Sequence, residues 1–139
     1  MILLDTNVLI YAFDPDSPHS DWARETIASS VAEGGAAINA VSLAEICVGD
    51  NAPGTVADRI RRWGVEIVDV PVAAAEACAE AYRRYRKRRF AQSGKDASTM
   101  PLPDFFIGAH AQIMSWELAT ADKGRFSTYF PKVRLKTPL

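Results

Sequence analysis

The chain has few of the residues that build disulfides and zinc sites. It contains two cysteines and two histidines in 139 residues. Cys47 and Cys78 lie in separate apolar, helix-like patterns, which favours buried free thiols over a disulfide or a zinc site. His19 and His110 are also isolated, and we interpret both as structural. No apolar run is long enough to cross a bilayer, and no basic stretch precedes a long apolar core, so we expect a cytoplasmic protein without signal peptide or membrane partner.

The chain also has little net charge, −1, but its charges are unevenly placed. Six of the seven residues from Arg83 to Arg89 are basic, and the seventh is Tyr85. After Asp122 the chain has no further acid, and the basic residues there are Lys123, Arg125, Lys132, Arg134 and Lys136. Two cationic zones on a nearly neutral protein indicate a polyanionic partner, although such runs also serve as solvated faces.

Length and periodicity predict one α/β domain spanning residues 1–139. The composition, 48% hydrophobic and 24% charged, is ordinary for a folded protein. We expect strands at 2–4, 36–39, 65–70 and 117–121, and an edge strand at 133–135. We expect helices at about 8–11, 19–33, 42–49 and 55–63, from 71 into the arginine cluster, and from 104, with the longest loop at 92–103. This alternation predicts a three-layer α/β/α sandwich with a central, mostly parallel sheet.

Asp5 ends the first predicted strand. Ile2, Leu3 and Leu4 form a continuous apolar run, which favours a strand buried on both faces in the middle of a parallel sheet. The carboxyl ends of such strands meet at the crevice where ligands bind in open α/β sheets. Asp is also a preferred helix N-cap, so Asp5 taken alone is either a site residue or a cap.

Three more acids occur at predicted element ends. Asp122 follows a strand, and Glu45 and Asp104 are expected in the first turns of helices. Each has a structural alternative: Glu45 completes a capping box with Ser42, Asp104 favours the positive end of its helix, and Asp122 is typical of a turn. If all four acids share one cleft, they repel by about 3 kcal/mol per pair at about 6 Å in an effective dielectric near 20. Such a site requires a cation, and oxygen ligands suit Mg²⁺ or Mn²⁺.

The acidic segments resemble, in order and spacing, the four motifs of PIN-domain ribonucleases. They are Leu4-Asp-Thr-Asn-Val-Leu9, Ser42-Leu-Ala-Glu-Ile46, Pro103-Asp-Phe-Phe-Ile-Gly-Ala-His-Ala111 and Leu118-Ala-Thr-Ala-Asp-Lys-Gly-Arg-Phe126. The chain length is similar to that of the stand-alone VapC-type toxins of toxin–antitoxin pairs. The resemblance implies a central parallel sheet between helices, a divalent-metal-dependent endoribonuclease, an antitoxin partner and a homodimer. The long 92–103 loop departs from the family's pattern.

The resemblance also implies roles for individual residues. Asp5, Glu45, Asp104 and Asp122 match positions that bind one or two divalent metal ions, with Asp5 as the central ligand and Glu45 binding metal or activating the nucleophile. Thr6, Asn7 and Thr120 match polar positions that hold those acids or the metal-bound water.

Basic residues in two places are candidates for contacts with RNA. Lys123 and Arg125 lie just past Asp122 and are expected at the scissile or an adjacent phosphate. Arg86 and Arg89 belong to the arginine cluster, for which three roles stay open. The first is to bind the RNA backbone, the second is to bind an acidic segment of an antitoxin, and the third is to offset the negative end of its own helix dipole.

Other functions fit the pattern less well. A haloacid-dehalogenase-type phosphatase needs a second Asp two residues after Asp5, where Asn7 stands. A receiver domain needs an acidic pair after its first strand, and Asp5 supplies one acid. A catalytically silent PIN-like RNA- or partner-binding module is the remaining alternative, and the presence of all four acids favours the nuclease.

Overall fold

A five-stranded sheet organises the computed structural model, which describes residues 1–138. Its spatial order is β3-β2-β1-β4-β5, and each neighbouring pair is parallel. The strands are β1 (Ile2–Leu4), β2 (Ala36–Asn39), β3 (Glu66–Val68), β4 (Glu117–Ala119) and β5 (Leu135–Lys136). The first strand is therefore the central one, and the predicted parallel α/β architecture is confirmed.

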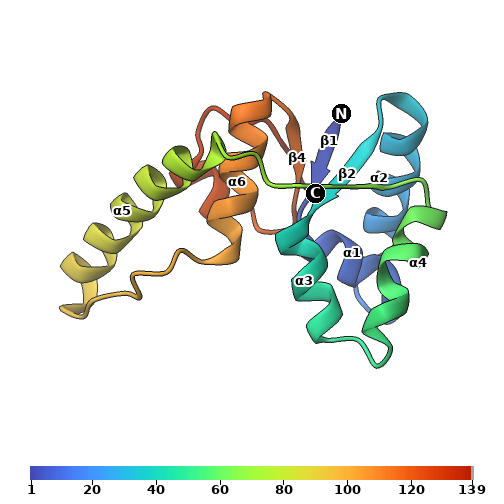
Figure 1. The fold of residues 1–139 in the computed structure, drawn as a ribbon, viewed down its shortest axis with the longest axis horizontal. Helices are drawn as coiled ribbons and strands as arrows, with labels where there is room; N and C mark the ends of the chain where they lie inside the picture. Colours follow the sequence, from blue (N-terminus) through green and yellow to red (C-terminus); the bar gives the residue numbers. More distant parts are fainter. Residues whose placement is uncertain (139) are drawn as a thin grey trace.

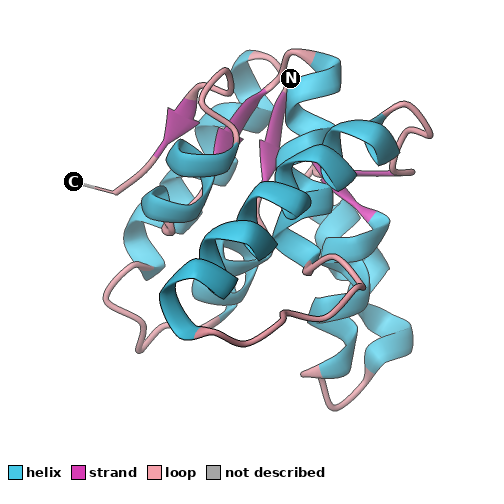
Figure 2. Cartoon of the chain, turned by 90° about the vertical axis from the view of Figure 1, so that its left-hand side faces the viewer, coloured by secondary structure: helices cyan, strands magenta, loops and turns pink. Residues whose placement is uncertain are grey.

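Helices cover both faces of this sheet. They are α1 (Thr6–Phe13), α2 (Ser20–Glu33), α3 (Ala40–Val48), α4 (Val56–Arg62), α5 (Ala74–Ser93), α6 (Pro103–Met114) and α7 (Lys123–Tyr129), with a 3₁₀ turn at Pro53–Thr55. In Figure 1, α1, α2 and α4 lie on one side of β1 and β4, and α5 and α6 lie on the other. Figure 2 shows the strands enclosed between the two groups of helices. None of the helices within residues 1–138 is long and apolar enough to span a membrane.

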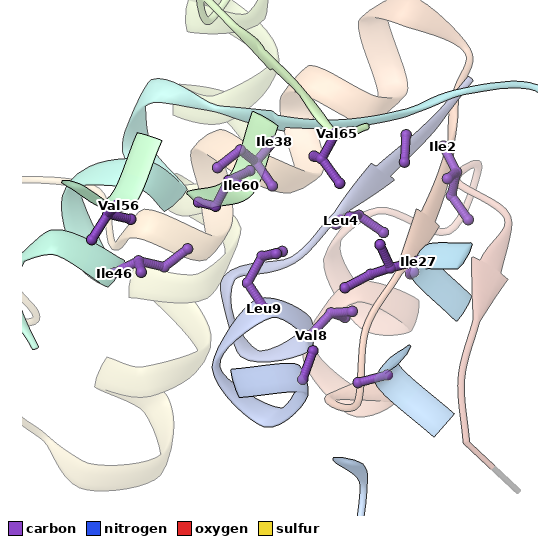
Figure 3. Packing of buried hydrophobic residues seen from close by; sticks show 14 residues of the cluster. Ile2, Leu4, Val8, Leu9, Ile27, Ile38, Ile46, Val56, Ile60 and Val65 are labelled. Carbon is purple, nitrogen blue, oxygen red and sulfur yellow. The ribbon is translucent and has the colours of Figure 1, made fainter. Parts of the chain in front are cut away.

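Alternate residues of β1 face the two cores. Ile2 and Leu4 pack into the core formed with α1 to α4, part of which Figure 3 shows. Leu3 packs into the other core, with Phe105 and Phe126. Fully burying an apolar side chain stabilises the fold by about 1.5–3 kcal/mol. The burial of β1 on both faces therefore fixes the backbone position of Asp5, the residue that follows it.

Two helices differ from the expectation. For α5 the sequence predicts an inward stripe of Val72, Ala75, Ala79 and Tyr82. Tyr82 is buried as predicted, but Val72 is 91% exposed, and the other buried residues of α5 are Ala74, Cys78 and Ala81. Alanines on every face of this segment give no period from which the inner face can be read. Helix α7 was not expected, because it is short and buries Phe126 alone among its residues.

Candidate active site

Asp5 lies at the carboxyl edge of the sheet, between β1 and α1. Leu4 pairs with Ala119 in the parallel register, so the residues that follow them, Asp5 and Thr120, come side by side. The Asp5 backbone is extended (φ −67°, ψ 153°) and caps α1. From the sequence, Asp5 was either a helix cap or a site residue. In the structure it is the N-cap of α1 and also lies near Asp104 and Glu45.

Two hydrogen bonds fix the Asp5 carboxylate, which is 3% exposed. Its Oδ1 accepts from the Thr6 backbone N–H at 2.7 Å, and its Oδ2 accepts from the Thr120 hydroxyl at 2.7 Å. Each oxygen keeps a second lone pair. The carboxylate is therefore held in one orientation without exhausting its ability to bind a cation.

Thr6 joins Asp5 to Glu45 on α3. The Thr6 hydroxyl donates to Glu45 Oε1 at 2.7 Å, so one threonine contacts both acids through its backbone and its side chain. The predicted capping box of Ser42 and Glu45 is wrong. Asn39, the last residue of β2, caps α3 by accepting from the Ser42 N–H at 3.0 Å. Because α3 then begins at Ala40, Glu45 lies beyond the first turn and its carboxylate is free to face Thr6.

Asn39 also connects β2 to α6, a role that the sequence interpretation missed. Its Oδ1 is occupied by Ser42, so its amide nitrogen donates to Nδ1 of His110 at 3.2 Å. Burial lowers the pKa of His110, which keeps the imidazole neutral and able to accept. An Asn at a strand end before a helix is a recognisable cap, and that pattern was the available signal.

Asp104 and Asp122 reach Asp5 and Glu45 from the starts of α6 and α7, and we call the site formed by these four acids the acidic cleft. Pro103 starts α6, which puts Asp104 in its first turn. A terminal nitrogen of Arg125 lies 3.6 Å from Asp104 Oδ2. Asp122 is exposed at the start of α7, and its backbone N–H donates to the Thr120 hydroxyl oxygen at 2.9 Å. Asn7 accepts from the Ala121 N–H at 3.4 Å, so it supports the turn that carries Asp122.

The pKa values show that the acids act on one another. Burial raises the pKa of Asp5 to about 7; hydrogen bonds from Thr120 and Thr6 oppose this rise, and the charges of Asp104 and Glu45 add to it. Burial also raises the pKa of Asp104, Arg125 opposes that rise, and Glu45 and Asp122 add to it. The cluster is thus an excess of negative charge with Arg125 as a counter-ion.

The chemistry of these donors fits a hard divalent cation. All of them are carboxylate oxygens, which Mg²⁺ and Mn²⁺ prefer, and a cation would relieve their mutual repulsion. Within residues 1–138, however, no three His, Cys, Asp or Glu side chains already stand as a ligand set for an ion. Asp104 is instead paired with Arg125. Sharing one ion therefore requires the side chains to close around it.

The basic residues predicted to contact nucleic acid lie on α7 and α5. Arg125 lies beside Asp104, and its guanidinium carbon is also 5.4 Å from the centre of the Tyr85 ring. Lys123 is exposed at the first position of α7. Arg89 donates to the Tyr85 hydroxyl at 2.8 Å, and Arg86 is half-buried on α5. Tyr85 therefore connects the cationic end of α5 to the acidic cleft through Arg125.

The chain is similar to known proteins over most of its length. The family model of the PIN domain matches residues 2–130. No curated protein matches the sequence significantly.

Several solved structures are similar over the whole chain. A toxin–antitoxin complex from Klebsiella pneumoniae contains a chain 25% identical to this one, with a TM-score of 0.65 and coverage of 100% of this chain and 98% of that one. VapBC2 from Rickettsia felis, bound to a DNA fragment from its promoter, gives 21% identity, a TM-score of 0.62 and 100% coverage of both chains. VapC20 from Mycobacterium tuberculosis, a Sarcin-Ricin loop cleaving toxin, gives 16% identity, a TM-score of 0.62 and coverage of 96% and 99%. These likenesses confirm the predicted fold.

Proposed function

Because the chain belongs to the PIN-domain family, we propose that it is a divalent-metal-dependent endoribonuclease. The observation that carries the proposal is the environment of Asp5. Its carboxylate is buried, oriented by two hydrogen bonds, and subject to the charges of Asp104 and Glu45. A protein that places charges this way without a cation is destabilised by them, so the arrangement favours a function that uses a cation.

The residues that would hold Mg²⁺ or Mn²⁺ are Asp5, Glu45, Asp104 and Asp122. When bound, such an ion supplies a water of lowered pKa and offsets charge on the phosphoryl oxygens. The protein's own contribution is orientation. Thr6 and Thr120 fix Asp5, Thr6 also fixes Glu45, and Asn7 supports the turn before Asp122. These three polar residues are positioning residues, and their bonds keep the acids directed into the cleft.

Lys123 and Arg125 would bind the substrate's phosphates. Both lie on the helix that follows Asp122, and Arg125 is already beside Asp104. Guanidinium and ammonium groups make charge-assisted hydrogen bonds to phosphate oxygens. If Asp104 held a metal ion, the Arg125 guanidinium would be free to bind the RNA backbone.

The biological role that we propose is the toxin of a type II toxin–antitoxin pair. It is supported by the whole-chain likeness to the Klebsiella pneumoniae and Rickettsia felis complexes. An antitoxin protein is then the cognate partner. The homodimer stays a prediction, which sedimentation of the purified protein checks.

A cleavage assay tests the nuclease. End-labelled structured and single-stranded RNAs are incubated with Mg²⁺, with Mn²⁺ or with chelator. The wild type should cleave with metal and not with chelator, and Asp5→Asn should lower the rate more than about 100-fold, since losing a ligand costs more than losing a residue that orients one. Asp21→Asn, which removes an exposed acid in the first turn of α2, is the matched control and should cleave as the wild type does.

The second candidate is the catalytically silent RNA- or partner-binding module. The observation in its favour is that, among the described residues, Asp104 pairs with Arg125 and no ligand set is ready for an ion. No cleavage under any metal condition, with RNA binding intact, would establish this alternative. For the toxin role, expression should arrest growth unless a small neighbouring gene product is co-expressed, and arrest should disappear in Asp5→Asn.

A further inference from the structure

The last turns of α5 present cations and an aromatic ring on one face. Arg83, Arg86, Lys87 and Phe90 follow the spacing i, i+3, i+4, i+7, which puts them on the same side of a helix. A hollow of about 310 Å³ lies against this face, and Asp96 lines it from the segment that follows the helix. We call it the α5 hollow. It is separate from the acidic cleft, and no step proposed above uses it.

The wall opposite α5 is held in place by α5 itself. The helix ends at Gly94, whose left-handed conformation (φ 70°) turns the chain back. The Tyr82 hydroxyl then donates to the Ser98 carbonyl at 2.8 Å, which ties the returning segment to the helix. Figure 1 shows this segment running back beside α5 to the start of α6.

The residues of the hollow are available to a ligand. Phe90 is 54% exposed, so its ring is accessible to a ligand in the hollow. Within residues 1–138, Arg84 is the member of the arginine cluster that forms a salt bridge, with Glu80, and Arg86 and Lys87 form none. The last turn of α5 is Phe-Ala-Gln-Ser, so the cations end one turn before the helix does. A dipole effect falls off within the last turn, which argues against the cluster serving as a helix-end complement.

The mixture of groups favours a nucleotide over an acidic peptide. Aromatic faces stack on nucleobases, and Arg and Lys bind phosphates. Asp96 would repel the carboxylates of an acidic peptide, but a carboxylate accepts hydrogen bonds from the amino group of a base. The acid thus distinguishes the base side of the hollow from the phosphate side.

A neighbouring face of the same helix reaches the acids through Tyr85, which does not itself line the hollow. Arg89 donates to the Tyr85 hydroxyl, and Arg125 lies over the Tyr85 ring and beside Asp104. Phe90 lies five residues beyond Tyr85, about 7.5 Å of helix rise and about 140° around the helix axis. RNA that reaches from the acids along these cations would arrive at the hollow after a short run of backbone.

We propose that the α5 hollow binds one unpaired nucleotide of the substrate RNA. Phe90 stacks on the base, and Asp96 accepts from its amino group. Arg86 and Lys87 contact the flanking phosphates, with Arg83 beside them. The inference rests on the proposed function in one respect, that the RNA bound here is the RNA cleaved at the acids. It implies a substrate with a single-stranded or bulged nucleotide a short distance from the cut.

Equilibrium binding in chelator tests the site without cleavage. The probe is a labelled, mixed-sequence single-stranded RNA of about 12 nucleotides, within the usual site size for such proteins, followed by fluorescence anisotropy. Phe90→Ala should weaken binding about tenfold, the loss expected for one stacked base. Phe90→Tyr should bind as the wild type does. Phe90→Leu, which keeps bulk and apolarity but lacks a π face, should behave like Phe90→Ala.

Controls and charge variants complete the test. Trp63→Ala, which removes another exposed aromatic ring after α4, should leave binding unchanged. Arg86→Gln should reduce the salt slope of log K by about 0.7, the value for one neutralised phosphate on a single strand, while Phe90→Ala leaves the slope as it was. A blunt RNA duplex should bind wild type and Phe90→Ala equally, because its bases are already stacked.

Three results would overturn the site. The first is wild-type RNA affinity in Phe90→Leu, and the second is an equal loss of duplex and single-strand affinity in Phe90→Ala. The third is that Phe90→Ala loses affinity for a labelled polyglutamate peptide and keeps its affinity for RNA. These results can be told apart from a failure of the nuclease proposal. A protein that cleaves nothing but loses RNA affinity in Phe90→Ala keeps the nucleotide site, whereas an active nuclease that is indifferent to Phe90 lacks it.

Discussion

The acidic cleft and the basic end of α5 are held in opposite ways. In the cleft, Asp5 is buried and accepts two side-chain or backbone hydrogen bonds, and Glu45 is fixed through Thr6. At the end of α5, Arg83 and Lys87 are exposed, and Phe90 is more than half exposed. The cleft lies on the central strands of the sheet, and the basic end extends beyond α6 (Figure 1).

This difference matches the two tasks of the proposed nuclease. Chemistry on a phosphodiester needs charges whose positions do not change, and burial with hydrogen bonds supplies them at a cost in folding stability. Holding a flexible polyanion needs exposed, adaptable cations, whose contribution is screened by salt. Substitutions in the cleft should therefore alter kcat and folding stability, and substitutions on α5 should alter KM and salt dependence.

The largest expected effect is on the stability of the metal-free protein. Burial raises the pKa of Asp5 from 3.8 to about 7, so the folded state holds the proton more tightly than the unfolded chain does. The contribution of Asp5 to stability is therefore complete below about pH 4, falls as pH rises to about 7, and is lost above, a total of up to about 4 kcal/mol. Asp5→Asn should remove this contribution from the pH profile of urea unfolding with chelator.

The α5 cations provide the contrast for that experiment. Arg86→Gln should change stability by less than about 0.5 kcal/mol at every pH, as expected for a surface substitution. Parallel pH profiles for wild type and Asp5→Asn would contradict the buried, cation-dependent character given to the cleft.

The next effect is on catalysis. Thr120→Val removes the hydroxyl that donates to Asp5 and accepts from the Asp122 N–H. Losing a group that orients a metal ligand lowers activity or metal affinity by about 10- to 100-fold. We expect a fall of this size in kcat at saturating Mn²⁺ or a matching rise in the metal requirement. Thr128→Val removes a threonine hydroxyl that bonds within α7 and should do neither.

A smaller effect is expected on substrate affinity. The double substitution Arg86→Gln with Lys87→Gln should raise KM for RNA, with kcat retained. It should also lower the salt slope by about 0.7 for each phosphate that the variant no longer neutralises. Arg61→Gln with Arg62→Gln removes two cations from the last turn of α4 and is the matched control. Equal effects of the α5 and α4 double substitutions would show that the α5 cations act only through the net charge of the protein.

The smallest effect concerns Arg125, which belongs to both regions. Removing it frees Asp104 from a half-exposed ion pair, and such pairs contribute about 0–1 kcal/mol. Arg125→Gln should therefore tighten Mn²⁺ binding by up to about fivefold while weakening RNA binding. Weaker binding of both would show that Arg125 supports the acids and does not compete for them.

The sequence predicted the central features well, for reasons that are local. The apolar run Ile2–Leu4 specified a central strand, and Asp5 follows it by covalent geometry. Pro103 started α6, so Asp104 was readily placed. These elements depend on neighbours in the chain.

Features that depend on distant residues were harder to predict. The capping box at Ser42 was wrong because Asn39, held between Ser42 and His110, starts α3 earlier. The Thr6 bond to Glu45 joins residues 39 positions apart, and the Arg125 pair depends on α7, a helix with one buried residue. No local pattern carries such long-range interactions.

Binding of Mn²⁺ is the measurement that tests the central claim most directly, because it needs no knowledge of the RNA. The free-ion signal in electron paramagnetic resonance is followed while protein is added, for wild type, Asp5→Asn and the control Asp21→Asn. Saturable binding by wild type and Asp21→Asn, with binding at least about tenfold weaker in Asp5→Asn, is the result predicted for an ion held at Asp5. Equal affinity in all three proteins would contradict it.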